Sequence, residues 1–149
     1  MKIIQQKGFT LIELIVTLVI LSLISMIAAP AFIKMRDSQN FNRSIQELVS
    51  TFNSARSKAA LDRKNVEVIL ESTYKKNLNT DTSTQFYWMP YGDAFLKSSI
   101  KNITFSSNGG VYQASGNTVF TICKDPKSGV AKTISISIMG TAQITEGTC

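Results

Sequence analysis

The sequence contains no histidine and only two cysteines among its 149 residues. Histidine is the usual general base near neutral pH and the commonest metal ligand, and two cysteines alone do not complete a tetrahedral zinc site. A glycine-rich phosphate loop is also missing, because Gly109 and Gly110 form an isolated pair that is typical of a turn. The carboxylates are scattered without an acid–base pair. We therefore expect no metal, no other cofactor and no enzymatic activity.

Charged residues are absent from Leu14 to Ile33, a run of 20 residues. As a helix this run is roughly 30 Å long, which matches the hydrocarbon core of a bilayer. A helix of a soluble domain would rarely be apolar on every face over such a length. The pattern therefore predicts a helix that resides in a membrane for at least part of the protein's life.

Glu13 stands at the start of this apolar run. A carboxylate inside a membrane helix costs on the order of a few kcal/mol, so it is a functional candidate that needs a cationic partner. Cleavage between Gly8 and Phe9 would supply one, because the new α-amino group on Phe9 lies four residues from Glu13. In an assembly, Glu13 of one subunit would meet the Phe9 amine of its neighbour and set the axial register.

The segment Lys7-Gly8-Phe9-Thr10-Leu11-Ile12-Glu13 resembles the class III leader junction of type IV pilins and type II secretion pseudopilins. The resemblance implies that a prepilin peptidase cuts after Gly8 and methylates the new N-terminal Phe9. It also implies that Glu13 guides assembly and that Pro30 occupies a position where many pilins carry a helix-weakening proline. Residues 1–8 would be the leader, and residues 9–33 the transmembrane and assembly half of an N-terminal helix.

Two simpler interpretations of the N-terminus remain as alternatives. An ordinary secretory signal has a basic start, here Lys2 and Lys7, and a small-residue cleavage site that Ala29-Pro30-Ala31 could imitate. The apolar run is too long for that, and Glu13 does not belong in it. A permanent, uncleaved anchor leaves the Gly-Phe-Thr-Leu-Ile-Glu run unexplained.

The two cysteines are Cys123 and Cys149. Export would place them in an oxidising compartment, where a disulfide is expected. Closing a loop of about 27 residues contributes roughly 3–4 kcal/mol in the chain-entropy model. The bridge would hold the C-terminal strand in place; two free thiols are the alternative.

Residues 34–149 are expected to form one small domain of the α+β class. An amphipathic helix over 34–63 continues the apolar helix, with one apolar stripe that must pack on strands. The stripe comprises Phe41, Ile45, Leu48, Val49, Phe52, Ala55, Ala59 and Ala60. Helix termination is expected at Asp62-Arg63-Lys64-Asn65, with Asn65 suited to the left-handed cap. Pro30 should let the helix bend or melt locally.

From residue 66 the hydrophobic period changes to two, which predicts an antiparallel sheet over residues 66–149. The expected strands are residues 66–70, 85–89, 100–105, 117–123 and 132–139, with 111–113 pairing back and 140–144 extending the last strand. Residues 91–99 are expected to be a loop. Ile134, Ile136 and Ile138 should share one buried face.

Further segments resemble the GspH/FimT/FimU family of minor pilins and pseudopilins. They are Ala55–Ala59 with Asn65–Val68, Ile103–Gly110, Thr118–Cys123 and Ala131–Ser137. This resemblance implies the type IV pilin fold and a role at a fibre tip or in priming fibre assembly. Its partners would be other major and minor pilins or pseudopilins, bound through the N-terminal helix, and the prepilin peptidase.

Three roles within this family are considered. The first is a FimU-like minor pilin that initiates the type IV pilus and forms part of its tip, which is the interpretation we favour. The second is the type II secretion pseudopilin H. The third is a FimT-like DNA receptor. DNA-binding FimT proteins resemble one another in a C-terminal Gly-Arg-x-Arg motif. Here the corresponding residues are Gly140-Thr141-Ala142-Gln143, without arginine, so DNA contact would rest on Lys124, Lys127 and Lys132. These lysines more simply form a solvated face.

The expected location is the bacterial inner membrane, crossed once, with the N-terminus cytoplasmic and the globular domain periplasmic, before assembly into a pilus or pseudopilus. The formal net charge is +6 and falls to +4 when the leader removes Lys2 and Lys7. A mildly basic domain is compatible with an acidic partner such as DNA but does not indicate one.

Overall fold

The structure is a computed structural model that describes residues 9–75 and 79–149. Its elements are α1 (Leu11–Asp62), β1 (Val66–Leu70), β2 (Gln85–Trp88), β3 (Phe95–Leu96), β4 (Asn102–Phe105), β5 (Thr118–Cys123), β6 (Val130–Ile136) and β7 (Ala142–Thr148). The chain divides into two units, of which the described parts are residues 9–36 for the first and residues 37–75 and 79–149 for the second. The first unit is helical, and the second contains the rest of α1 and every strand.

α1 begins and ends with local capping interactions. Thr10 is the N-cap, because its carbonyl accepts the N–H of Leu14 at 3.3 Å and its hydroxyl accepts the N–H of Glu13 at 3.3 Å. At the other end Arg63 adopts a left-handed conformation with φ 51°, and the N–H of Lys64 donates to the carbonyl of Ala59 at 3.2 Å. This is a Schellman cap. The sequence had predicted Asn65 as the left-handed residue, but the structure places Arg63 in that conformation. α1 continues as α-helix through Pro30, so local melting is not observed there.

The predicted apolar stripe of α1 forms the core of the second unit. Phe41, Ile45, Leu48, Phe52, Ala55 and Ala59 are buried, whereas Val49 is half-buried and Ala60 is exposed. The ring of Phe52 lies 6.2 Å from that of Phe105 on β4 and 5.3 Å from that of Phe120 on β5. Full burial of such a ring contributes about 1.5–3 kcal/mol. A single helical side chain thus joins strands of two different sheets.

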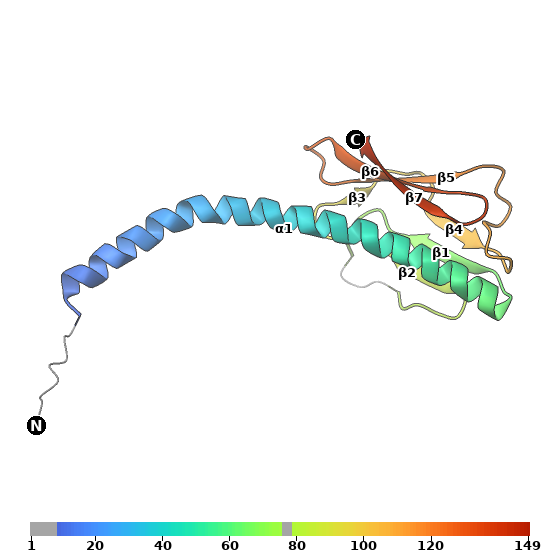
Figure 1. Ribbon diagram of the computed structural model, residues 1–149, viewed down its shortest axis with the longest axis horizontal. Helices are drawn as coiled ribbons and strands as arrows, with labels where there is room; N and C mark the ends of the chain where they lie inside the picture. Colours follow the sequence, from blue (N-terminus) through green and yellow to red (C-terminus); the bar gives the residue numbers. More distant parts are fainter. Residues whose placement is uncertain (1–8, 76–78) are drawn as a thin grey trace, which may run out of the picture. The chain divides into compact units, whose positions relative to one another are not determined.

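The strands form two sheets rather than one (Figure 1). The first has the order β2-β1-β4 and the second the order β3-β5-β6-β7. All pairs are antiparallel except β1 with β2, which is parallel. A parallel neighbour requires a long connection to return the chain to the same end of the sheet. The polar segment between β1 and β2, residues 71–84, provides that length.

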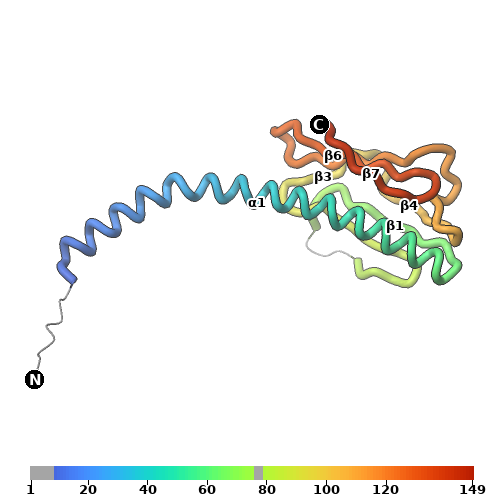
Figure 2. The backbone as a smooth tube through the Cα atoms, viewed as in Figure 1, coloured from blue at the N-terminus to red at the C-terminus, as the bar shows by residue number. Residues whose placement is uncertain are grey.

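The second sheet departs from the expected strand boundaries at its C-terminal end. Residues 140–144 do not extend β6, because the chain reverses at Gly140, φ 78°, and β7 pairs antiparallel with β6. Figure 2 shows this return, which brings the C-terminus back beside β6. Ile134 and Ile136 are buried as predicted, but Ile138 lies beyond β6 and is half-exposed.

The remaining differences concern short elements. The expected loop at residues 91–99 contains β3, which pairs with the end of β5. The expected return of residues 111–113 is reduced to one antiparallel bridge between Phe105 and Val111. Elements of two residues or fewer carry too little periodicity to be recognised from sequence.

Candidate functional site

The N-terminal turn of α1 carries the residues singled out as an assembly site. Thr10 and Glu13 occupy the N-cap and N3 positions, and this Thr-x-x-Glu spacing is that of a capping box. A carboxylate in the first turn also interacts favourably with the helix dipole. The backbone N–H of Glu13 therefore takes part in capping α1, a local role that the spacing alone could have revealed, whereas the pairing of its carboxylate with an amine stays a prediction. Gly8 lies outside the described residues, whereas Phe9 is described and its side chain is 78% exposed.

The apolar part of α1 is unburied along its whole described length. Every residue from 9 to 36 is exposed, and the helix is long and apolar enough to cross a membrane. Its hydroxyl groups are already satisfied internally: Thr17 donates to the carbonyl of Leu14 at 2.8 Å, Ser22 to Val19 at 2.7 Å and Ser25 to Leu21 at 2.8 Å. These bonds leave each of the three donors satisfied, as an apolar environment requires.

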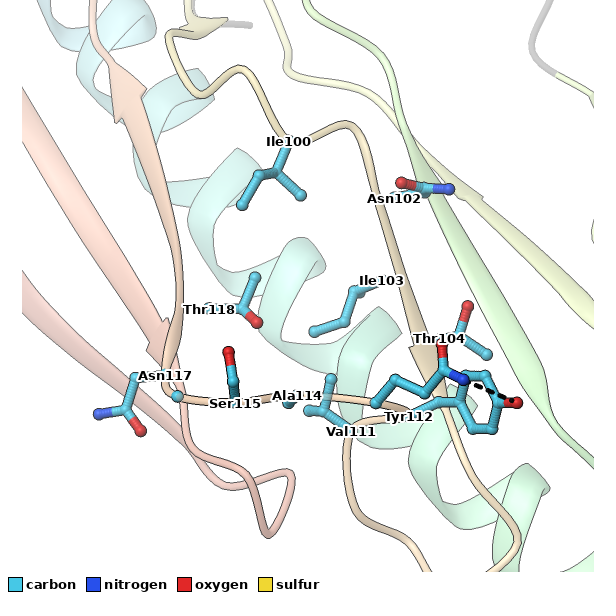
Figure 3. Close-up of a pocket in the computed structure, with 12 residues that line it drawn as sticks. Ile100, Asn102, Ile103, Thr104, Val111, Tyr112, Ala114, Ser115, Asn117 and Thr118 are labelled. Carbon is cyan, nitrogen blue, oxygen red and sulfur yellow. Dashed lines mark hydrogen bonds between the residues drawn. The ribbon is translucent and has the colours of Figure 1, made fainter.

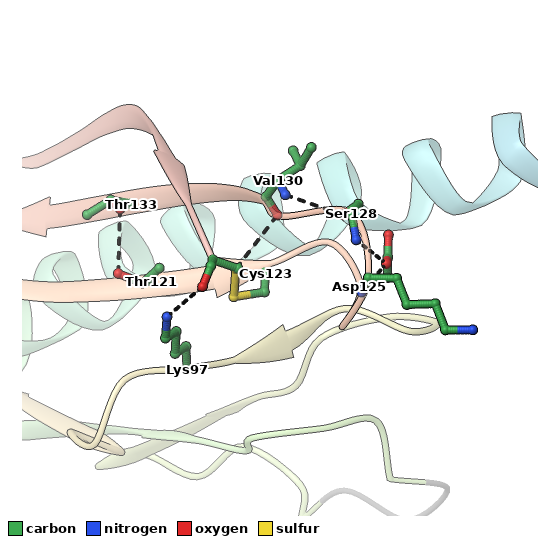
Figure 4. Close-up of a disulfide and its surroundings, with 9 residues drawn as sticks. Lys97, Thr121, Cys123, Asp125, Ser128, Val130 and Thr133 are labelled. Atoms are coloured by element: carbon green, nitrogen blue, oxygen red, sulfur yellow. Dashed lines mark hydrogen bonds between the residues drawn. A yellow bond between two sulfur atoms is a disulfide. The ribbon is translucent and has the colours of Figure 1, made fainter.

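Cys123 and Cys149 are joined by a disulfide (Figure 4). Cys123 ends β5 and is fully buried, and Cys149 follows β7, so the bridge spans from β5 across β6 to the chain end. Lys97 Nζ donates to the backbone oxygen of Cys149 at 2.9 Å. The bridge and this hydrogen bond tie the end of β7 to β5 and to the segment after β3, which agrees with the prediction that the bridge holds the C-terminal strand in place.

Two of the three lysines considered for DNA contact are directed toward α1. Lys124 Nζ donates to Ser38 Oγ at 2.8 Å, and Lys132 Nζ donates to Asn42 Oδ1 at 3.4 Å and lies 3.6 Å from Glu146 Oε1. These contacts fasten the second sheet to the helix. The third, Lys127, is exposed in the turn after β5.

The turn that carries Lys127 is organised by Asp125. Its Oδ1 accepts the backbone N–H groups of Lys127 at 2.8 Å and Ser128 at 2.7 Å. Hydrogen bonding by the Ser128 side chain, and then by the Lys127 N–H, lowers the pKa of Asp125. The carboxylate beside these lysines is thus ionised and reduces the positive potential that an anionic partner would meet.

A polar cluster that sequence analysis missed lies where α1 meets the segment after β2. The buried Ser44 hydroxyl accepts the N–H of Tyr91 at 2.8 Å, and the Trp88 indole N–H donates to the Ser44 carbonyl at 3.1 Å. The Arg43 guanidinium stacks 4.3 Å from the Tyr91 ring centroid. Burial raises the pKa of Tyr91, and the hydrogen bond that Arg43 donates to Glu47 raises the pKa of Arg43. Ser44 falls on the apolar stripe by spacing, which was the available signal.

An open groove of about 420 Å³ lies between β4 and the start of β5 (Figure 3). Ile103 and Val111 contribute apolar surface, and the segment from Tyr112 to Gly116 forms one wall. α1 passes behind the groove in this view. Across the part of the chain that the structure describes, no group of three or more His, Cys, Asp or Glu side chains could hold a metal ion. The amides, hydroxyls and apolar side chains that line the groove are considered below as a surface for binding.

Comparison with known proteins agrees with this architecture. A family model for the prokaryotic N-terminal methylation motif matches residues 4–29, and one for type II transport protein GspH matches residues 44–140. A crystal structure of the type IV minor pilin FimU from Pseudomonas aeruginosa PAO1 is similar to this chain, with 20% identity and a TM-score of 0.54 over 74% of this chain and 92% of that one. A second crystal form of FimU matches with 23% identity and a TM-score of 0.47 over 70% and 91% of the two chains. No curated protein matches the chain.

These matches decide the fold and the family. The likeness to FimU identifies the type IV pilin fold, a long N-terminal helix that begins apolar and whose later, amphipathic part packs on mainly antiparallel sheets. The methylation motif covers the segment that contains Gly8, Phe9 and Glu13. Because the GspH model spans more than half of the sequence, the chain belongs to the GspH family of pilin-like proteins.

Proposed function

We propose that this protein is a structural, non-enzymatic minor pilin that takes part in initiating a type IV pilus and in forming its tip. The observation that carries the proposal is the exposed apolar helix that begins at a prepilin methylation motif. Such a helix is stable only in lipid or among other apolar helices. The fold is that of FimU, itself a type IV minor pilin, and this favours the pilus as the destination.

The proposed life cycle begins in the inner membrane. The N-terminus is cytoplasmic, residues 9–33 span the bilayer, and residues 34–149 are periplasmic. Prepilin peptidase removes residues 1–8 by cutting between Gly8 and Phe9, and Phe9 is then N-methylated. The internally satisfied hydroxyls of Thr17, Ser22 and Ser25 suit both lipid and a helix bundle.

Assembly then moves the helix from lipid into contact with the helices of neighbouring pilins. The Phe9 amine of one subunit neutralises Glu13 of the next. This pairing offsets the desolvation cost of burying the carboxylate and sets the axial register. Pro30 lacks a backbone N–H and so weakens the helical hydrogen bonding at its position, which gives the helix room to adapt to its neighbours.

The second candidate is a pseudopilin of a type II secretion system. The matching family model describes a type II transport protein, and this supports the candidate directly. A DNA receptor has weaker support, because Lys124 and Lys132 contact α1 and Asp125 lies beside Lys127.

The test is a count of surface pili by electron microscopy in a strain that lacks this protein and in which retraction is also blocked. Rare or absent pili, restored by the intact gene, are expected for a protein that primes the fibre. Normal pili would overturn the proposal. Measurement of secreted proteins in the same strain then tests the pseudopilin candidate, and DNA uptake tests the receptor.

A further inference from the structure

The outer edge of β4 is open over the groove between the two sheets. In an antiparallel ladder the N–H and C=O of one residue point to the same side, and successive residues alternate. The N–H of Leu70 on β1 donates to the carbonyl of Lys101 at 2.7 Å, so Lys101, Ile103 and Phe105 direct their backbone groups toward β1. Asn102 and Thr104 therefore direct theirs away from β1, toward the groove.

Only part of this edge is occupied by the chain itself. The N–H of Tyr112 donates to the Thr104 carbonyl at 2.8 Å, and the backbone then turns away at Gln113, φ 52°. Among the described residues, no strand lies beside the N–H of Thr104 or beside the N–H and C=O of Asn102 on that side.

The facing edge of β5 is also incomplete at its start. β3 pairs only with Ile122 and Cys123. The two residues that follow β3 donate further hydrogen bonds to β5. The Lys97 N–H donates to the Thr121 carbonyl at 2.9 Å, and Ser98 Oγ donates to the Val119 carbonyl at 3.1 Å. By the same alternation the N–H of Val119 points to this edge. Two sheet edges thus present backbone groups on either side of the groove.

The groove is uncharged. None of its 12 lining residues is Asp, Glu, Lys or Arg; beside the amides and hydroxyls it offers Ile100 and Tyr112, which are 43% and 48% exposed. Unpaired edge groups flanked by apolar and neutral polar side chains are the features of a site that receives an added strand. The open groups of this edge run from Asn102 to Thr104, which as a strand is about 10 Å long and sets the length of the segment that could pair with it.

We propose that this groove receives a short, extended, uncharged segment of a neighbouring pilin-like subunit, which adds as a strand along β4 at Asn102 and Thr104. The identity of the partner as a fibre subunit rests on the proposed function. The added strand would complete the hydrogen bonding of both edges and join the two sheets. It would give the globular domain a contact in the fibre that is independent of the N-terminal helix.

The test is site-specific photocross-linking in cells with the full chain, using p-benzoylphenylalanine in place of Tyr112 in the groove. The matched control carries the probe in place of Tyr74, which is 52% exposed and does not line the groove. We expect the first probe, and not the second, to cross-link to an uncharged segment of another pilin-like subunit, identified by mass spectrometry. Equal cross-linking at both positions, no protein cross-link, or a cross-link to a second copy of this chain would overturn the proposal.

Two pairs of variants make the result specific to the groove. A Cβ added at Gly116 meets no heavy atom within 4 Å, so a side chain can begin there. Gly116→Phe adds bulk at the groove lining, and Gly116→Ala is its control. Thr104→Pro removes an outward N–H without removing a bond to β1, and Thr148→Pro makes the same change at the outer edge of β7. Gly116→Phe and Thr104→Pro should abolish the Tyr112 cross-link, and the controls should retain it. Persistence of the cross-link in both variants would refute strand addition.

Failure of this proposal is separable from failure of the proposed function. Loss of pili in the deletion strain, together with no cross-link from the Tyr112 probe in the otherwise unaltered chain, would retain the minor pilin and reject the groove. Normal piliation in the deletion strain would reject the minor pilin, while cross-linking to a pseudopilin would still support the groove.

Discussion

Ser44 Oγ accepts the backbone N–H of Tyr91 at 2.8 Å, although Ser44 lies on the buried face of α1 among apolar side chains. The same hydroxyl donates to the carbonyl of Asn40 at 2.8 Å. The helix and the segment after β2 are therefore joined by a directional contact inside the core. A buried hydroxyl with both roles filled is costly to remove, because its partners lose hydrogen bonds that water cannot replace.

Replacement of this hydroxyl should destabilise the globular domain. Ser44→Ala leaves the Tyr91 N–H without its acceptor, and we expect a loss of about 1–3 kcal/mol in the free energy of unfolding. The measurement is urea unfolding of the detergent-solubilised protein. Ser50→Ala, at an exposed position of the same helix, should be neutral or slightly stabilising. Equal effects of the two substitutions would contradict this role of Ser44.

The turn between β6 and β7 requires glycine at position 140. Gly140 has φ 78°, and an added Cβ would collide with the carbonyl oxygen of Gly109 and approach Arg56 Cδ to 3.1 Å. Arg56 Nε also donates to the Gly109 oxygen at 3.0 Å, so this side chain has little freedom to move away. Gly140→Ala should therefore cost clearly more than the roughly 1–2 kcal/mol of a left-handed residue alone.

Gly129 provides the matched control for that experiment. It has φ 65°, but an added Cβ meets no heavy atom within 4 Å, so Gly129→Ala should cost only the conformational strain. Thermal unfolding of both variants compares the two effects. If Gly129→Ala lowers the melting temperature as much as Gly140→Ala, the steric contact with Gly109 is not important.

Loss of the disulfide should weaken the domain substantially. Cys149→Ser opens a loop with a sequence separation of 26 residues, and we expect a loss of roughly 3–4 kcal/mol. Reduction of the unaltered protein should lower its urea midpoint to about that of Cys149→Ser. The reductant should leave the midpoint of Cys149→Ser unchanged. An unaltered protein that is insensitive to the reductant would show that the bridge adds no stability.

Substitutions at Glu13 can separate its charge from its helix-capping role. Glu13→Gln keeps a side chain that can complete the capping box but removes the charge, and Glu13→Ala removes both. If pairing with the Phe9 amine sets the register, both variants should be cleaved normally and yet be depleted from sheared fibres. Immunoblots of membrane and fibre fractions measure this distribution.

Thr10→Ala is the complementary variant, because it removes the N-cap hydroxyl and leaves Glu13 charged. It should lower incorporation less than either change at Glu13. Normal incorporation of Glu13→Gln would refute the register-setting role, and stronger depletion of Thr10→Ala would assign the effect to capping.

Local sequence was sufficient wherever the structure depends on neighbouring residues. The apolar run and the stripe from Phe41 to Ala59 follow from chemistry within a few helical turns, and the helix and its buried face were predicted from them. The capping spacing of Thr10 and Glu13 is equally local but was not used in the prediction. The disulfide was predicted because Cys123 and Cys149 are the two cysteines of the sequence and export would place them in an oxidising compartment, and the structure confirms it. Cleavage after Gly8 and methylation of Phe9 remain predictions that rest on the leader motif.

Tertiary structure decided the features that depend on distant residues. The pattern of β1 and β2 gives no sign that they pair in parallel, because side-chain alternation is the same in both orientations. Burial of Ser44 depended on Trp88 and Tyr91, and the directions of Lys124 and Lys132 depended on Ser38 and Asn42. The groove exists because β4 is the edge of one sheet and the start of β5, beyond its short pairing with β3, is open in the other, and no local pattern encodes where one sheet stops and another begins. The sequence by itself determined the helix, its membrane character and the family, since these need only local periodicity and a contiguous motif, whereas the shape and chemistry of the globular surface arose only when the chain folded.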